Sequence, residues 1–133
     1  MTDKFFIDTN IVLYAICNEG TKSEIAQNLL NFKPTISTQV VAESINVMIK
    51  KLKISKIEAF DKASDLLLVS SLSYIHESTL RLAFDVSNKY QFSYWDSLIV
   101  AVALENNCKI LYSEDMSHNL IINEKLKIVN PFF

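Results

Sequence analysis

The sequence contains a single glycine, Gly20, among its 133 residues. The two common glycine-rich phosphate-binding loops, the dinucleotide fingerprint G-x-G-x-x-G and the P-loop, each need more than one glycine, so both are excluded. Histidine and cysteine are also scarce, with two of each. His76 and His118 belong to no cysteine–histidine cluster, which argues against a zinc site. Any chemistry must therefore come mainly from carboxylates and hydroxyls.

Long hydrophobic runs are missing as well. The apolar run at residues 98–104 is far shorter than the about 20 residues that cross a bilayer. The start of the chain has neither the basic segment nor the cleavage site of a signal peptide. Cys17 and Cys108 form no paired motif, which is typical of reduced cysteines. We therefore expect a cytoplasmic protein with no membrane association.

The composition is that of one globular domain covering residues 1–133. Hydrophobic residues make up 50% of the chain, enough for a core. The net charge of −2 argues against broad coating of nucleic acid but leaves a local basic patch open. Four lysines cluster beyond residue 49, in a pattern that also fits a solvated helix end. They are Lys50, Lys51, Lys53 and Lys56.

Short apolar runs alternate with helical patterns along the chain. We expect strands at residues 5–7, 35–37, 74–75, 109–112 and 127–129. We expect helices at about 10–17, 22–31, 38–52, 56–69 and 77–89, and one that begins at 93. In the 56–69 helix, Ile57, Phe60 and Leu67 are the core candidates. Strands separated by helices predict an α/β fold with a mostly parallel sheet, whose ligands bind beyond the carboxyl ends of the strands.

Four acids lie near the ends of these elements. Asp8 follows the first strand, Asp115 follows the fourth, and Asp96 lies in the first turn of an apolar helix. Glu43 borders the apolar stripe of its helix. Each acid has a structural alternative. Asp8 can cap a helix, Asp96 can complete a capping box with Ser93, Asp115 can begin a turn, and Glu43 can be solvated.

Taken together, the four acids would repel one another unless a cation binds among them. Mg²⁺ or Mn²⁺ suits such a site, because hard cations prefer carboxylate oxygens and water. Asn10 and Ser113 stand beside the acids in the sequence. They can orient a carboxylate or a metal-bound water, or they can simply satisfy turn backbone groups.

Four segments carry a resemblance to a known family: residues 7–10 (IDTN), 39–43 (QVVAE), 94–101 (YWDSLIVA) and 111–118 (LYSEDMSH). In this order they resemble the motif regions of PIN-domain proteins, most closely those of VapC-type toxins from bacterial toxin–antitoxin pairs. The resemblance implies a three-layer α/β/α fold with a five-stranded sheet in the order 3-2-1-4-5. One departure is Asn119, where relatives often have glycine, although asparagine tolerates a left-handed backbone.

The resemblance also implies a Mg²⁺- or Mn²⁺-dependent endoribonuclease that hydrolyses RNA phosphodiester bonds. Its catalytic acids would be Asp8, Glu43, Asp96 and Asp115. Of these, Asp8, Asp96 and Asp115 are expected to bind metal, and Glu43 either binds a second ion or orients the attacking water. The implied partners are an RNA substrate, a small antitoxin protein and a second copy of the chain.

Two other classes of function remain open. A catalytically silent PIN-like module would bind RNA or protein, although the presence of all four acids speaks against it. A phosphohydrolase or phosphoacceptor on a similar sheet fits poorly. The haloacid-dehalogenase type needs Asp-x-Asp after the first strand, where this chain has Asn10. A receiver domain needs an aspartate after the third strand, where this chain has His76 and Glu77.

Three further residues carry weaker expectations. His118 is expected at the surface, with a phosphate contact as the alternative. Glu114 is expected to be solvated and not a ligand. Trp95 is expected in the core or at a dimer contact, while Tyr94 or Trp95 stacked on a base is the alternative.

Overall fold

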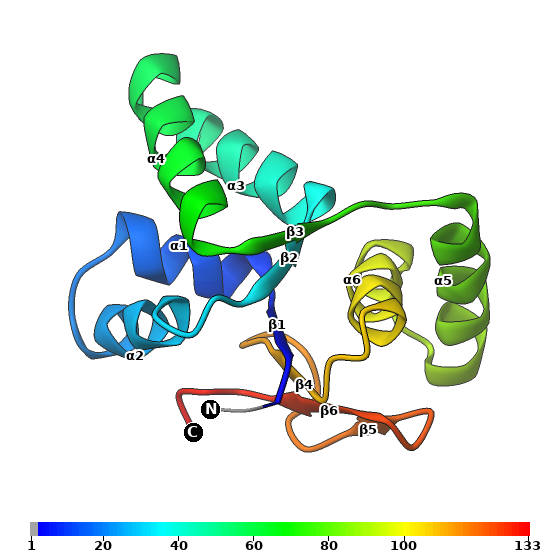
Figure 1. Ribbon diagram of the computed structural model, residues 1–133. Coiled ribbons are helices and arrows are strands. Elements are labelled where there is room, and N and C mark those ends of the chain that lie inside the picture. Colours follow the sequence, from blue (N-terminus) through cyan, green and yellow to red (C-terminus); the bar gives the residue numbers. More distant parts are fainter. Residues whose placement is uncertain (1–2) are drawn as a thin grey trace.

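The structure is a computed structural model that describes residues 3–133, so Met1 and Thr2, where the signal-peptide argument begins, lie outside it. Within that range one sheet has the strand order β3-β2-β1-β4-β6-β5 (Figure 1). The strands are β1 (Phe5–Ile7), β2 (Thr35–Ser37), β3 (Ser71–Ser73), β4 (Ile110–Tyr112), β5 (Ile121–Ile122) and β6 (Leu126–Val129). The helices are α1 (Thr9–Cys17), α2 (Thr21–Leu30), α3 (Thr38–Lys50), α4 (Lys56–Val69), α5 (Glu77–Tyr90) and α6 (Tyr94–Glu105).

The helices cover the sheet in two layers. Figure 1 shows α1 and α2 on one side of the strands and the paired helices α5 and α6 on the other, while α3 and α4 extend beyond them. Every residue of β1 is buried, and so are residues 97–103 of α6. No helix within residues 3–133 is long and apolar enough to cross a bilayer. The expected three-layer α/β/α architecture is confirmed.

The parallel strands bring several chain reversals to one edge of the sheet. β1 pairs in parallel with both β2 and β4, and the register aligns Ile7 with Tyr112. The Asp8 amide continues this ladder by donating to the Tyr112 carbonyl at 3.0 Å. The residues that follow β1 and β4 therefore leave the sheet side by side, as expected from the order 3-2-1-4-5.

The strand predictions need two corrections. The predicted fifth strand is β6, and the short strand β5 was missed because two residues are too few to show an alternating pattern. The third strand is Ser71–Ser73 and not Tyr74–Ile75. It lies at the edge of the sheet, where one side of a strand has no neighbour, so serines can replace the apolar residues of a central strand.

The core prediction for α4 is wrong. Ile57, Phe60 and Leu67 are exposed, Ile57 to 78%. The buried residues of α4 are instead Ala59, Ala63 and Leu66, which recur at steps of four and three residues. Small alanines allow α4 to pack closely against α3, and this leaves larger apolar side chains unpartnered on the opposite face. That apolar face of α4 consists of Ile57, Phe60, Leu67 and Leu68.

In several turns of the chain, residues other than glycine adopt the left-handed conformation. Asn119 has φ 71°, so the left-handed conformation expected at this position is confirmed. Gln91 ends α5 with φ 62° and donates its backbone N–H to the Ser87 carbonyl. Within residues 3–133, the non-glycine residues with positive φ are Lys33, Lys53, Gln91, Asn107, Asn119, Asn123 and Glu124.

Candidate functional site

Asp8 lies between the end of β1 and the start of α1. Its side chain is a helix cap as well as a candidate ligand, because Oδ1 accepts from the Thr9 amide at 2.7 Å. Oδ2 accepts from the Ser113 hydroxyl at 2.9 Å. Asp8 is only 7% exposed. This burial raises the pKa of Asp8 to about 6, and the charges of Asp96 and Glu43 add to the increase. The two hydrogen bonds act in the opposite direction and lower the pKa.

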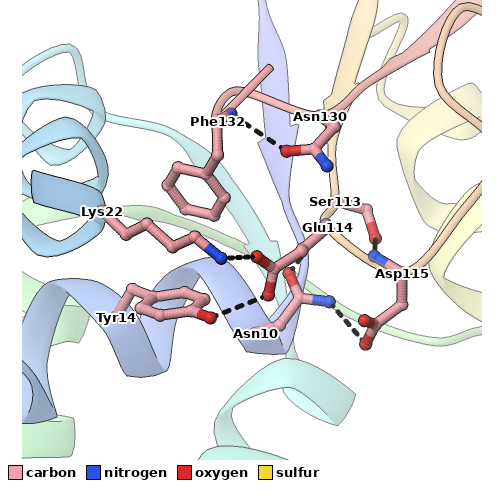
Figure 2. A network of polar contacts seen from close by, with 8 residues as sticks. All are labelled: Asn10, Tyr14, Lys22, Ser113, Glu114, Asp115, Asn130 and Phe132. Carbon is pink, nitrogen blue, oxygen red and sulfur yellow. Dashed lines mark hydrogen bonds and ion pairs between the residues drawn. The ribbon is translucent and has the colours of Figure 1, made fainter.

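Asn10 joins the loop after β4 to the start of α1. Its Oδ1 accepts from the Glu114 amide at 3.2 Å, and its Nδ2 donates to Asp115 Oδ2 at 3.0 Å. The same Nδ2 lies 3.5 Å from Asp8 Oδ2. The Asp115 amide in turn donates to Ser113 Oγ at 3.3 Å. Asn10 and Ser113 therefore hold the Asp8 and Asp115 carboxylates, and Figure 2 shows this arrangement around Asp115.

Glu43 is fixed by two residues that the sequence did not single out. The Thr9 hydroxyl donates to Glu43 Oε1 at 2.6 Å, and Gln39 Nε2 donates to Oε2 at 3.2 Å. Gln39 Nε2 also donates to the Trp95 carbonyl at 3.1 Å, which links α3 to α6. One feature of the sequence could have identified Gln39 as a partner of Glu43. It lies four residues before Glu43, and residues at i and i+4 share a helix face.

Asp96 occupies the first turn of α6. Its amide donates to Ser93 Oγ at 3.1 Å, so the predicted cap at Ser93 is present. Burial raises the pKa of Asp96, and the charges of Asp115 and Glu43 raise it further. Asp8, Glu43, Asp96 and Asp115 thus share one electrostatic environment at the carboxyl edge of the sheet. We refer to these four acids as the acidic site.

The acidic site is not a preformed metal centre. Among residues 3–133, no three acidic, histidine or cysteine side chains converge closely enough to form a ready-made metal centre. The carboxylates of Asp8, Glu43 and Asp115 instead accept hydrogen bonds from the chain. The donor set is nonetheless made of carboxylate oxygens, and burial, with a smaller contribution from mutual repulsion, raises the pKa of two members. Both properties fit a hard divalent cation, which would neutralise the cluster.

Glu114 is not the solvated residue that the sequence predicted. The Tyr14 hydroxyl donates to Glu114 Oε1 at 2.9 Å, and Lys22 Nζ forms an ion pair with Oε2. The same Nζ lies 5.3 Å from the centre of the Phe132 ring. Lys22 and Tyr14 lower the pKa of Glu114. Figure 2 shows Glu114 turned toward these residues and away from Asp115.

The remaining candidates lie outside the acidic site. His118 Nδ1 accepts from the Asn130 amide at 3.0 Å, and its ring stacks on Phe133 with 4.3 Å between centroids. These contacts give His118 a structural role. The four lysines are exposed. Trp95 is 62% exposed, so the prediction that it packs in the core is wrong.

Comparison with solved structures shows similar folds at low sequence identity. VapBC2 from Rickettsia felis, bound to a promoter DNA fragment, aligns with a TM-score of 0.73 and 20% identity, over 95% of this chain and 98% of that one. A toxin–antitoxin complex from Klebsiella pneumoniae gives 0.72 and 17%, over 96% and 97%. The toxin VapC20 from Mycobacterium tuberculosis, which cleaves the sarcin–ricin loop, gives 0.67 and 17%, over 84% and 90%.

These structural similarities concern the fold alone. Comparison with curated protein sequences gives no significant match. A family model described as PIN domain matches residues 5–120, which includes β1, β4 and all four members of the acidic site. The chain therefore belongs to the PIN-domain family.

Proposed function

We propose that the protein is a Mg²⁺- or Mn²⁺-dependent endoribonuclease and the toxin component of a toxin–antitoxin pair. The observation that carries this proposal is the acidic site, in which four carboxylates from distant parts of a PIN domain share one electrostatic environment. Such a cluster is unfavourable without a cation and suits phosphodiester chemistry with one.

The proposed metal ligands are Asp8, Asp96 and Asp115. A divalent ion held there would lower the pKa of a bound water and stabilise charge on the phosphate oxygens. Glu43, fixed by Thr9 and Gln39, either orients the attacking water or contributes to a second ion. Asn10 and Ser113 position the carboxylates of Asp115 and Asp8 through their hydrogen bonds.

The similar structures support the proposed biological role. One is a toxin that cleaves the sarcin–ricin loop, one is a toxin–antitoxin complex, and one is VapBC2 bound to a fragment of its promoter DNA. We propose that this chain likewise binds RNA, a small antitoxin protein and a second copy of itself in the cytoplasm. The apolar face of α4 supports such assembly, because a contiguous exposed apolar patch commonly marks a protein interface. The two free cysteines fit a reducing compartment.

The enzymatic proposal predicts cleavage of single-stranded RNA that depends on a divalent ion. We expect the purified chain to cut RNA internally with Mg²⁺ or Mn²⁺, to be inactive in EDTA, and to recover when the ion is restored. Gel electrophoresis of end-labelled RNA measures this directly. If RNA binds without being cut under any of these ions, a silent RNA-binding module becomes the better description.

The assembly proposal predicts a dimer in solution. Light scattering should give about twice the chain mass of 15.2 kDa at high protein concentration. An Ile57→Lys variant is a useful companion, because a charge on the apolar face of α4 should weaken any interface built there without disturbing the core. A mass of 15.2 kDa at every concentration would contradict the dimer.

A further inference from the structure

We propose that Trp95 forms a subsite on which one base of single-stranded RNA stacks, next to the acidic site. The proposal rests on the ribonuclease function proposed above and adds a residue that positions the substrate. Three observations support it. An aromatic cluster that includes Trp95 is exposed, the main chain of Trp95 is linked to Asp96 and Glu43, and the charge around Trp95 is not favourable to phosphates.

Trp95 belongs to an exposed aromatic ridge, which we define as Phe84, Tyr94 and Trp95. These side chains are 51%, 37% and 62% exposed, respectively. Ring centroids lie 6.0 Å apart between Phe84 and Tyr94, and 5.6 Å apart between Tyr94 and Trp95. The Tyr94 and Trp95 rings meet at 65°, so Tyr94 does not lie flat on the indole as a base would. A large indole left this exposed is typical of a binding contact.

The main chain of Trp95 is tied to the acidic site. Trp95 directly precedes Asp96, and its carbonyl accepts from Gln39 Nε2 at 3.1 Å. That nitrogen also donates to Glu43 Oε2 at 3.2 Å. The helix turn that carries Trp95 is fixed in addition by the Ser93 cap. A base stacked on Trp95 would therefore belong to a nucleotide close to the phosphodiester that faces Asp96 and Glu43.

The local charge favours stacking as the means of binding at this end of the molecule. The acidic site repels phosphates when no cation is bound, and the whole chain carries a net charge of −2. The lysine cluster begins at Lys50, about 10 Å along α3 from Glu43, because a helix rises about 1.5 Å per residue. Stacking on an aromatic ring needs no positive charge and accepts every base.

The first test uses fluorescence. Trp95 is the only tryptophan in the chain, so its emission reports on this site alone. A Glu43→Gln protein, which keeps the three proposed metal ligands and should cut RNA far more slowly, is titrated in Mg²⁺ with an RNA octamer of mixed sequence and with an abasic octamer that keeps the phosphates. We expect the octamer with bases to quench the emission and the abasic octamer to leave it nearly unchanged. Equal quenching by both, or quenching by neither, would overturn the subsite.

The second test is kinetic. In the wild-type background, Trp95→Ala should raise the KM for a short RNA by about 5- to 150-fold, the range that corresponds to single base–aromatic contacts, with a smaller effect on kcat. Trp95→Phe should recover most of this loss. Phe32→Ala is the matched control, because Phe32 is equally an exposed aromatic but precedes β2 at the opposite edge of the sheet. Melting temperatures should be unchanged in all three variants.

The outcomes separate this proposal from the proposed function. If the Trp95→Ala protein cuts RNA with wild-type KM, the subsite is wrong and the ribonuclease proposal stands. If wild-type protein cuts no RNA, the ribonuclease proposal fails, and the fluorescence titration still decides whether bases stack on Trp95. An emission maximum that moves to shorter wavelength with protein concentration, in the absence of RNA, would place Trp95 in a contact between copies and overturn the proposal.

Discussion

An Asp8→Asn variant should lose RNA cleavage by more than about 100-fold, because even residues that only support a metal ligand contribute about 10- to 100-fold. The substitution removes the charge that a divalent ion needs and keeps the size of the side chain. Cleavage of end-labelled RNA by the two proteins, at saturating Mg²⁺ or Mn²⁺, measures the effect. An Asp85→Asn variant makes the same chemical change at an exposed position on α5 and should cleave normally.

The fold should survive this substitution. Asparagine caps helices about as well as aspartate, so the contact with the Thr9 amide can be kept. The Ser113 hydroxyl, which donates to Asp8, can rotate and accept from the new amide instead. If Asp8 were only a helix cap, both cleavage and stability would be nearly unchanged. Undiminished cleavage would therefore remove Asp8 from the mechanism.

Stability without metal should change with pH in a defined direction. The pKa of Asp8 is raised from 3.8 to about 6 in the folded protein, so the folded state holds this proton more tightly than the unfolded chain does. The resulting stabilisation is complete below pH 3.8 and is lost as the pH rises through about 6. The loss is on the order of 3 kcal/mol, since one pKa unit corresponds to about 1.4 kcal/mol.

The Asp8→Asn variant lacks this proton and should lack this part of the pH dependence. In EDTA at pH 7 it should be more stable than the wild type, and the difference should shrink toward pH 4. Urea denaturation of both proteins at pH 4, 5, 6 and 7 gives the comparison. Parallel stability profiles would show that Asp8 ionises normally in the folded protein.

The second large effect concerns Mn²⁺, which should raise the melting temperature of the wild-type protein. An ion present at 100 times its dissociation constant stabilises a protein by about 2.7 kcal/mol. For a domain of this size that corresponds to about 10 °C. Asp8→Asn, Asp96→Asn and Asp115→Asn should each remove most of the increase, because each takes away a proposed ligand.

A Glu114→Gln variant distinguishes a specific ion site from nonspecific attraction of Mn²⁺ by negative charge. Glu114 is adjacent to Asp115 but is engaged by Lys22 and Tyr14, so this variant should keep the full response to Mn²⁺. A structure with Mn²⁺ bound should show oxygens of Asp8, Asp96 and Asp115 at about 2.0–2.3 Å from the ion. This requires the carboxylates to exchange hydrogen bonds for metal contacts. Carboxylates that remain directed to separate places around bound Mn²⁺ would exclude a shared site.

Local patterns predicted much of the fold. The alternation of strands and helices and the caps at Asp8 and Ser93 follow from short stretches of sequence, and all are present. The adjacency of Asp8 and Asp115 followed from the expected pairing of the first and fourth strands. These features depend on backbone propensity and on parallel pairing, which a sequence displays directly.

Other features depend on long-range packing and could not be predicted in this way. The apolar residues of α4 were expected inside, because a pattern shows that a face is apolar but not whether this protein covers it. The Glu114–Lys22 pair joins residues 92 positions apart, and the Thr9–Glu43 contact joins residues 34 apart. Such contacts depend on how helices cross, and neither partner's local sequence encodes that. The prediction of Trp95 in the core was wrong for the same reason, since exposure of a large aromatic is decided by its neighbours.

The seven left-handed residues have a consequence for engineering. A side chain in this conformation costs about 1 kcal/mol relative to glycine, and least for asparagine. This chain tolerates that cost in most of these turns. Glycine would remove the cost, and the extra backbone entropy of glycine in the unfolded state offsets only part of that gain. Lys53 and Gln91 lie at helix ends outside the acidic site and are not asparagine. They are therefore natural first positions for glycine substitutions in a thermostabilised version of this scaffold whose chemistry is left intact.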